Sequence, residues 1–142
     1  MKKEFTFPVR VYYEDTDAGG VVYHANYLRF MERARTECLR TVGFDVARLT
    51  EQNIFFVVRR VEVNYLRPAR LGDALVVMSR VMKASRAKLI FQQTVCVHHE
   101  EQPPSGRSSQ GEPLCIGNIT VVCVNSKMKL CRIPLQVVES IQ

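Results

Sequence analysis

The sequence lacks the long apolar segments of membrane proteins and exported proteins. No run approaches the ~20 consecutive apolar residues of a membrane-spanning helix. Residues 1–6 include two lysines, but neither an apolar stretch nor a small-residue cleavage site follows, so the pattern of a signal peptide is missing. We therefore expect a cytoplasmic protein without a transmembrane segment.

Paired cysteines and basic clusters are also missing. The five cysteines are an odd number and form no C-x-x-C pair, which favours reduced, mostly buried thiols over disulfides or a metal site. Acidic residues number 14 against 20 basic ones, and a net charge of +6 favours an anionic partner such as a nucleic acid, a membrane surface or a phosphorylated small molecule. Since no basic run reaches five residues and no RNP-type aromatic motif occurs, we do not expect a nucleic-acid partner.

A single long helix is predicted near the N-terminus. Apolar residues recur there at steps of three and four, which is the period of one face of a helix (Tyr27, Met31, Ala34, Cys38 and Val42). Asn26 is the expected N-cap and Gly43 the expected C′ residue, so the helix should cover residues 26–42.

Strands are predicted on both sides of this helix. One strand precedes it, at residues 5–13, and everything after about residue 53 has strand character. The later predicted strands lie at residues 60–65, 74–82, 88–98 and 114–125. A polar hairpin loop is expected at residues 100–113, and a short tail helix from Pro134. The chain of 142 residues thus predicts one α+β domain, residues 1–142, in which an antiparallel sheet wraps around a helix. Because one helix leaves much of such a sheet uncovered, we expect at least a dimer.

The densest group of reactive side chains lies between the first strand and the helix, in residues 13–24. It contains three carboxylates, two tyrosines and a histidine. A loop that leads into a helix N-terminus is a good catalytic position, because unpaired backbone N–H groups and the helix dipole stabilise an anion there. Asp15 and Asp17 could instead only cap turns. A metal site built from these two and His24 has no recognised ligand spacing.

Three blocks of this sequence resemble the hotdog-fold thioesterases. They are the stretch from Tyr13 to Tyr27 (YEDTDAGGVVYHANY), the segment ERARTE at residues 32–37 and the segment PARLGD at residues 68–73. The order and content of these blocks are similar to the 4-hydroxybenzoyl-CoA thioesterase superfamily, and within it to the Tol-Pal-associated (YbgC-type) acyl-CoA thioesterases. The resemblance implies the hotdog fold, a five-stranded antiparallel sheet wrapped around one long central helix, and homodimers or homotetramers with active sites between subunits.

The same resemblance implies the activity and the residues that perform it. The expected reaction is hydrolysis of acyl-CoA to a free acid and CoA, with no cofactor because CoA is part of the substrate, and acyl carrier protein is a possible second acyl donor. Asp17 corresponds to the catalytic carboxylate, as nucleophile or as general base. His24 supplies a backbone N–H for the oxyanion, and its side chain is a second candidate. Tyr13 could orient a carboxylate, and Arg86 and Lys88 correspond to a nucleotide-binding segment.

Two other functions fit the same fold less well. A hotdog protein that binds acyl-CoA without cleaving it has no need of the Asp17 carboxylate. A hotdog dehydratase would need an acid on the helix, and Glu32 and Glu37 fall outside its apolar stripe. The stretch 102–113 is longer than the short turn typical of this branch, so the sequence departs from the family pattern at that hairpin.

Overall fold

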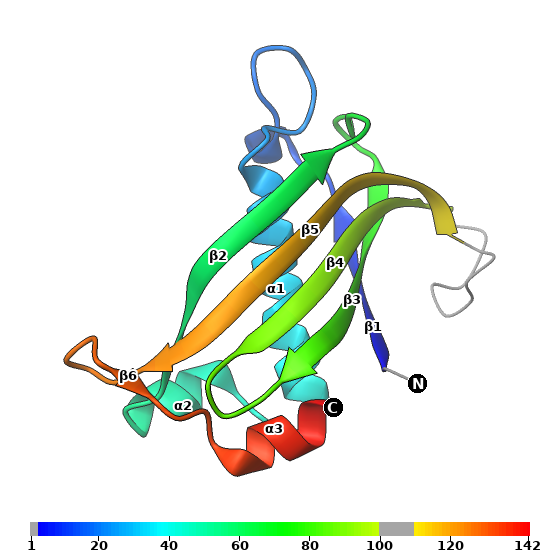
Figure 1. The fold of residues 1–142 in the computed structure, drawn as a ribbon. Coiled ribbons are helices and arrows are strands. Elements are labelled where there is room, and N and C mark those ends of the chain that lie inside the picture. The colour runs from blue at the N-terminus through cyan, green and yellow to red at the C-terminus, as the bar shows by residue number, and fades with distance from the viewer. Residues whose placement is uncertain (1–2, 100–109) are drawn as a thin grey trace.

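A computed structural model describes residues 3–99 and 110–142, in which one curved antiparallel sheet wraps around helix α1, Asn26–Thr41 (Figure 1). The strands follow the order β1-β3-β4-β5-β2, and a short sixth strand, β6, pairs with β5. Their bounds are β1 Glu4–Arg10, β2 Phe55–Tyr65, β3 Ala74–Ala84, β4 Leu89–His98, β5 Gln110–Val124 and β6 Leu130–Cys131. This arrangement confirms the predicted α+β hotdog fold.

Several boundaries differ from the predicted ones. The first strand was predicted to reach residue 13 but ends at Arg10. Tyr13–Asp15 form a short 3-10 helix, η1, instead. A six-residue helix, α2 (Val46–Glu51), follows α1 and was not predicted, because six residues hold too little periodicity to be recognised. The tail helix α3 (Leu135–Ile141) begins directly after Pro134, as predicted. Of the expected loop at 100–113, residues 100–109 lie outside the described residues, and residues 110–113 belong to β5.

The core lies between α1 and the concave face of the sheet. Four of the five residues of the predicted apolar stripe are buried (Tyr27, Met31, Ala34 and Cys38), and Phe30 and Leu39 join them. Gly117 of β5 brings sheet and helix close together, since a Cβ there would lie 3.1 Å from the Met31 side chain. Burial of this helical face against the sheet is the main contribution to stability that the fold provides.

The residue that ends α1 was predicted correctly, whereas the residue that caps its start was not. Gly43 ends the helix with φ +95°, a left-handed conformation that glycine adopts without steric strain. Asn26 is not the N-cap, because Ala25 occupies that position and no side chain caps the helix. The Asn26 amide instead donates a 2.9 Å hydrogen bond to the buried carboxylate of Asp15.

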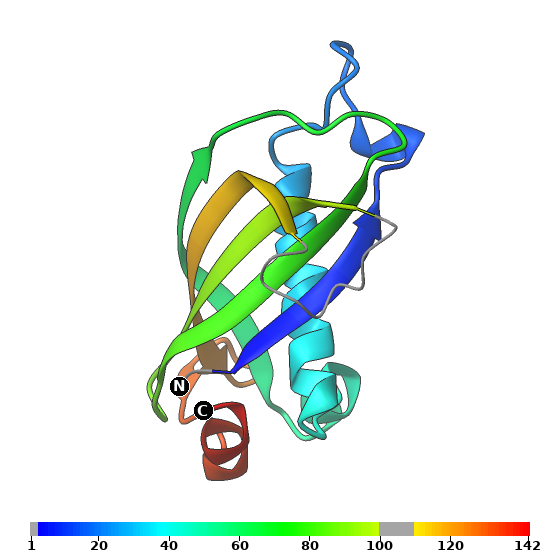
Figure 2. The same cartoon turned by 90° about the vertical axis from the view of Figure 1, so that its right-hand side faces the viewer.

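The connecting segments gather at opposite ends of α1. The loop between η1 and α1 and the β2–β3 connection lie at its N-terminal end, whereas α2, α3, the β3–β4 hairpin and β6 lie at its C-terminal end (Figures 1 and 2). Within residues 3–99 and 110–142, no helix is both long and apolar enough to cross a bilayer.

Candidate active site

A tight turn presents Asp17 at the N-terminal end of α1. Thr16 and Val22 form an isolated antiparallel bridge, and the N–H of Asp17 donates to the carbonyl of Val21 at 2.9 Å. Gly20 closes the turn with φ +79°, a conformation that other residues rarely adopt. One carboxylate oxygen of Asp17, Oδ1, accepts a 2.8 Å hydrogen bond from the N–H of Gly19. The other oxygen receives no hydrogen bond from the described residues, so it is available to a substrate or a water molecule.

The two aspartates of the loop have different environments. Asp15 is only 4% exposed, and both of its oxygens are engaged, one by the amide of Asn26 and the other by the backbone N–H of Tyr12 at 2.8 Å. Asp17 is exposed at the turn. Asp15 therefore serves to hold the loop, while Asp17 has the access that chemistry requires.

Contacts with the β2–β3 connection hold this loop in place. The N–H of Val22 donates to the carbonyl of Ala69 at 2.8 Å, and the hydroxyl of Tyr27 accepts from the N–H of Ala69 at 3.0 Å. Burial raises the pKa of Tyr27 above its usual value, so the phenol remains protonated at neutral pH. The start of α1, the Asp17 loop and the β2–β3 connection thus form one connected unit.

His24 lies at the entrance to α1 beside two aromatic rings. Its imidazole is 4.5 Å from the ring of Tyr23 and 6.3 Å from the ring of Tyr65, measured between centroids. The hydroxyl of Tyr65 donates to the His24 carbonyl at 2.8 Å. The backbone N–H of His24 has no partner among the described residues, and an unpaired N–H just before a helix is a suitable donor to an oxyanion.

Asp17 and His24 open into the same cleft, which has a volume of about 330 Å³. Tyr27, Tyr65 and Arg67 add polar groups to it, and four residues supply apolar walls (Val21, Val22, Leu66 and Pro68). Arg67 also forms an ion pair with Glu112 of β5. Asp17, His24 and Arg67 thus bring a carboxylate, a residue with an unpartnered backbone N–H among the described residues, and a cation to one partly apolar cleft, a set suited to an ester-like group with an anionic part.

The structure brings together some of the predicted site residues and separates others. Asp17 and His24 share the cleft, but Tyr13 lies on η1 with 82% of its surface exposed and does not line it. Arg86 and Lys88 belong to the β3–β4 hairpin at the opposite end of α1 (Figures 1 and 2). There the Nε of Arg86 donates to the carbonyl of Ile133 at 3.0 Å.

Sequence reasoning missed Tyr65 and Arg67. Both lie far from residues 13–24 in the sequence. They reach the cleft because the fold, in which β2 pairs with β5, places the end of β2 beside the start of α1. Arg67 stands directly beside the block at residues 68–73 that carried the resemblance, which was the only sequence signal for it.

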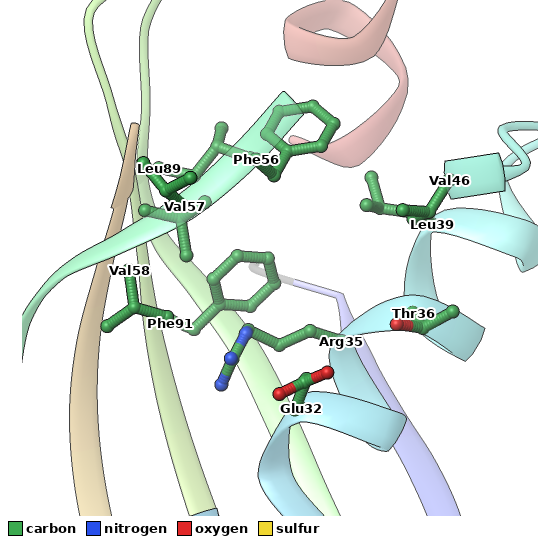
Figure 3. Close-up of a pocket in the computed structure, with 11 residues that line it drawn as sticks. Glu32, Arg35, Thr36, Leu39, Val46, Phe56, Val57, Val58, Leu89 and Phe91 are labelled. Atoms are coloured by element: carbon green, nitrogen blue, oxygen red, sulfur yellow. The ribbon is translucent and has the colours of Figure 1, made fainter. Parts of the chain in front are cut away.

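A second cavity, of about 320 Å³, lies along the C-terminal half of α1 (Figure 3). Its walls are mainly apolar and include Leu39, Phe56 and Phe91. Arg35 extends into it beside Phe91 and donates to the side-chain oxygen of Gln93 at 3.0 Å. Burial lowers the pKa of Arg35 below its usual value, and the nearby carboxylate of Glu32 opposes this shift. Such a cavity suits an apolar group with a hydrogen-bond acceptor at one end.

Comparisons with known proteins show which family and which fold the chain shares. Residues 19–103 match the family model described as the thioesterase superfamily. The Haemophilus influenzae acyl-CoA thioesterase YbgC is 54% identical over 90 residues, which cover 63% of this chain and 66% of that protein. The Escherichia coli acyl-CoA thioester hydrolase YbgC is 42% identical over 135 residues, which cover 94% of this chain and 92% of that protein. A crystal structure of a protein from Bartonella henselae, described as a probable thioesterase, superposes with a TM-score of 0.80 at 34% identity and covers 93% of this chain and all (100%) of that one.

Proposed function

The chain belongs to the thioesterase superfamily, and on this premise we propose that it hydrolyses the thioester bond of acyl-CoA with Asp17 as its catalytic carboxylate. The products are a free acid and CoA. The observation that carries this proposal is the position of Asp17 and His24 in one cleft at the start of α1, where the His24 backbone N–H has no partner among the described residues. The names of the H. influenzae and E. coli relatives support the substrate class.

The carboxylate of Asp17 starts the reaction in either of two ways. It attacks the thioester carbonyl directly, or it takes a proton from the water that attacks. Both routes need the charged carboxylate and a free oxygen lone pair, and only Gly19 donates to Asp17 among the described residues. The thiolate of CoA leaves, and a water molecule supplies the second oxygen of the released acid.

The N-terminal end of α1 stabilises the negative charge that develops on the carbonyl oxygen of the substrate. The backbone N–H of His24 is the proposed donor, and the dipole of the helix adds to the same field. Tyr65 restrains the backbone at this point by donating to the His24 carbonyl. The imidazole of His24 lines the cleft and is a second donor to substrate or water.

We propose further that the active unit is a homodimer or a homotetramer. Strand β2 lies at an edge of the sheet and exposes apolar side chains, with Val58 47% and Val61 39% exposed. An unpaired edge of this kind is a ready surface for a second copy. Tyr65 belongs to the same strand and to the cleft, so a subunit on this edge would lie beside Asp17 and help to exclude water from the reaction.

The nucleotide of CoA carries several phosphate charges and needs cations near the site. Arg67 lines the cleft, whereas Arg86 and Lys88 belong to the β3–β4 hairpin, at the far end of the same protomer. For Arg86 and Lys88 to contact the nucleotide, they must reach it from another subunit than the one whose Asp17 reacts. We also propose a cytoplasmic location, no cofactor besides the CoA of the substrate, and acyl carrier protein as a second acyl donor.

A thiol-release assay with acyl-CoAs of graded chain length tests the function directly. Turnover of at least one chain length that depends on Asp17 supports a hydrolase. Tight binding of acyl-CoA without any release of thiol would instead identify a binding protein. Light scattering on the same sample measures the oligomeric state, and a monomer that turns over at full rate would refute the proposed shared site.

A further inference from the structure

Two cysteines face each other across neighbouring strands at the C-terminal end of α1. Cys123 of β5 and Cys131 of β6 are direct partners in the antiparallel register. Their sulfur atoms are 3.1 Å apart. The other three cysteines are buried and have no such sulfur contact among the described residues (Cys38, Cys96 and Cys115).

The separation of the two sulfurs suits a disulfide with little movement of the backbone. A disulfide has a bond length of about 2.05 Å and spans Cα atoms about 4.4–6.8 Å apart. Directly opposed residues of antiparallel strands have Cα atoms about 4.5–5.5 Å apart, which falls inside that range. The sulfurs of Cys123 and Cys131 would have to approach by only about 1 Å.

The two thiols differ in their access to solvent. Cys123 is fully buried, whereas Cys131 is partly exposed. Burial, and after it the contact with Cys131, raises the pKa of Cys123 to about 12, so this thiol carries its proton until it reacts. A dissolved oxidant therefore reaches Cys131 first. Cys123 is buried next to it and is the second thiol to react.

We propose that Cys123 and Cys131 form a reversible disulfide when the protein meets a hydroperoxide. The sulfur of Cys131 attacks one peroxide oxygen, the O–O bond breaks, and the thiol proton joins the departing hydroxide to give water. Cys131 is thereby oxidised by two electrons to a sulfenic acid, and hydrogen peroxide is reduced to water. The sulfur of Cys123 then attacks the sulfenic sulfur as its proton passes to the sulfenic hydroxyl; the S–S bond forms, the S–O bond breaks, and the hydroxyl leaves as a second water. A dithiol reductant returns both residues to thiols by exchange.

The bond would fasten the C-terminal segment to the sheet. Two residues after Cys131, the buried Ile133 donates its N–H to the carbonyl of Arg86 at 2.8 Å, and its own carbonyl accepts from the Arg86 side chain. Helix α3 then packs Val137 and Ile141 into the core. The disulfide would restrain this segment and stabilise the oxidised protein, while the loop between η1 and α1, which contains Asp17, lies at the other end of α1 (Figure 1).

The test is peptide mapping of the purified, folded protein after treatment with hydrogen peroxide and blocking of the remaining thiols. Tryptic cleavage separates the two cysteines into peptides 108–127 and 130–132. We expect these peptides to be joined, with the loss of two hydrogen atoms, and to separate after dithiothreitol. The midpoint of thermal unfolding should rise by roughly 5–10 °C in the oxidised protein.

Variants assign the bond, since Cys115 shares the longer peptide with Cys123. Cys115→Ala should still form the joined peptide, whereas Cys131→Ser and Cys123→Ser should not. Cys131→Ser alters only a partly exposed position and should fold even if Cys123→Ser does not. Peroxide that leaves Cys123 unmodified and carries Cys131 to the sulfinic acid in the folded wild-type protein would overturn the proposal, as would a joined peptide that is lost in Cys115→Ala or persists in Cys123→Ser.

Discussion

Replacing Asp15 by alanine should destabilise the protein far more than the same change at Asp17, although the two aspartates are only two residues apart. Asp15 is buried, and its two oxygens accept from the Asn26 amide at 2.9 Å and from the Tyr12 N–H at 2.8 Å. Asp17 is exposed and accepts one local hydrogen bond from Gly19.

The magnitude follows from the partners that Asp15→Ala leaves behind. A hydrogen bond to a charged group contributes about 1.5–3 kcal/mol, and a buried donor without an acceptor costs about 1–3 kcal/mol. Asn26 is buried, at 8% exposed, so its amide loses its acceptor, whereas Tyr12 is 62% exposed and water can reach its backbone N–H more easily. We expect Asp15→Ala to lower the free energy of unfolding by about 2–4 kcal/mol, and Asp17→Ala to lower it by less than about 1 kcal/mol.

Urea unfolding followed by circular dichroism measures both values. Asp15→Asn is a useful third variant, because the Asn26 amide can rotate and accept from the new side chain, so its loss should lie between the other two. Equal free energies of unfolding for Asp15→Ala and Asp17→Ala would refute the assignment of Asp15 as the residue that holds the loop.

The other residues of the proposed site make separate predictions. His24→Ala should lose less activity than Asp17→Asn, because its backbone N–H remains; an equal loss in steady-state turnover would make the imidazole essential. Tyr65→Phe removes the hydrogen bond to the His24 carbonyl and should lower kcat about threefold to tenfold with little change in KM; a change confined to KM would contradict a role in positioning the oxyanion donor. Lys88→Ala should raise KM for acyl-CoA but not for acyl-pantetheine, which lacks the nucleotide; equal effects on both substrates would exclude nucleotide contact. Arg86→Ala should lower the thermal unfolding midpoint in addition to raising KM for acyl-CoA, because the Arg86 side chain donates a hydrogen bond to the carbonyl of Ile133.

Much of the fold could be predicted because its dominant signals are local. The apolar period of residues 26–42 identified α1, and Gly43 marked its end. Strands β3, β4 and β5 overlap their predicted ranges, since alternating apolar residues suit a sheet that is covered on one face.

The errors arose where tertiary contacts override local preference. Asn26 is a residue type that often caps helices, but here its side-chain amide donates a hydrogen bond to the buried Asp15 carboxylate. The two-residue β6 exists because it pairs with β5, and no pattern within it indicates a strand.

The candidate site was predicted only in part, and for the same reason. Asp17 and His24 lie in one continuous sequence block and share the cleft. Tyr65 and Arg67 join them through the pairing of β2 with β5, which short-range patterns do not contain.

The most direct test of the account is the turnover of acyl-CoA by Asp17→Asn. The amide keeps the size of the side chain and an oxygen for the Gly19 N–H, so folding and oligomeric state should match the wild type. Turnover should fall by at least ~10²-fold, because neither nucleophilic attack nor proton abstraction is possible without the carboxylate. If the folded variant retains about a third of the wild-type rate, the catalytic role assigned to Asp17 is wrong.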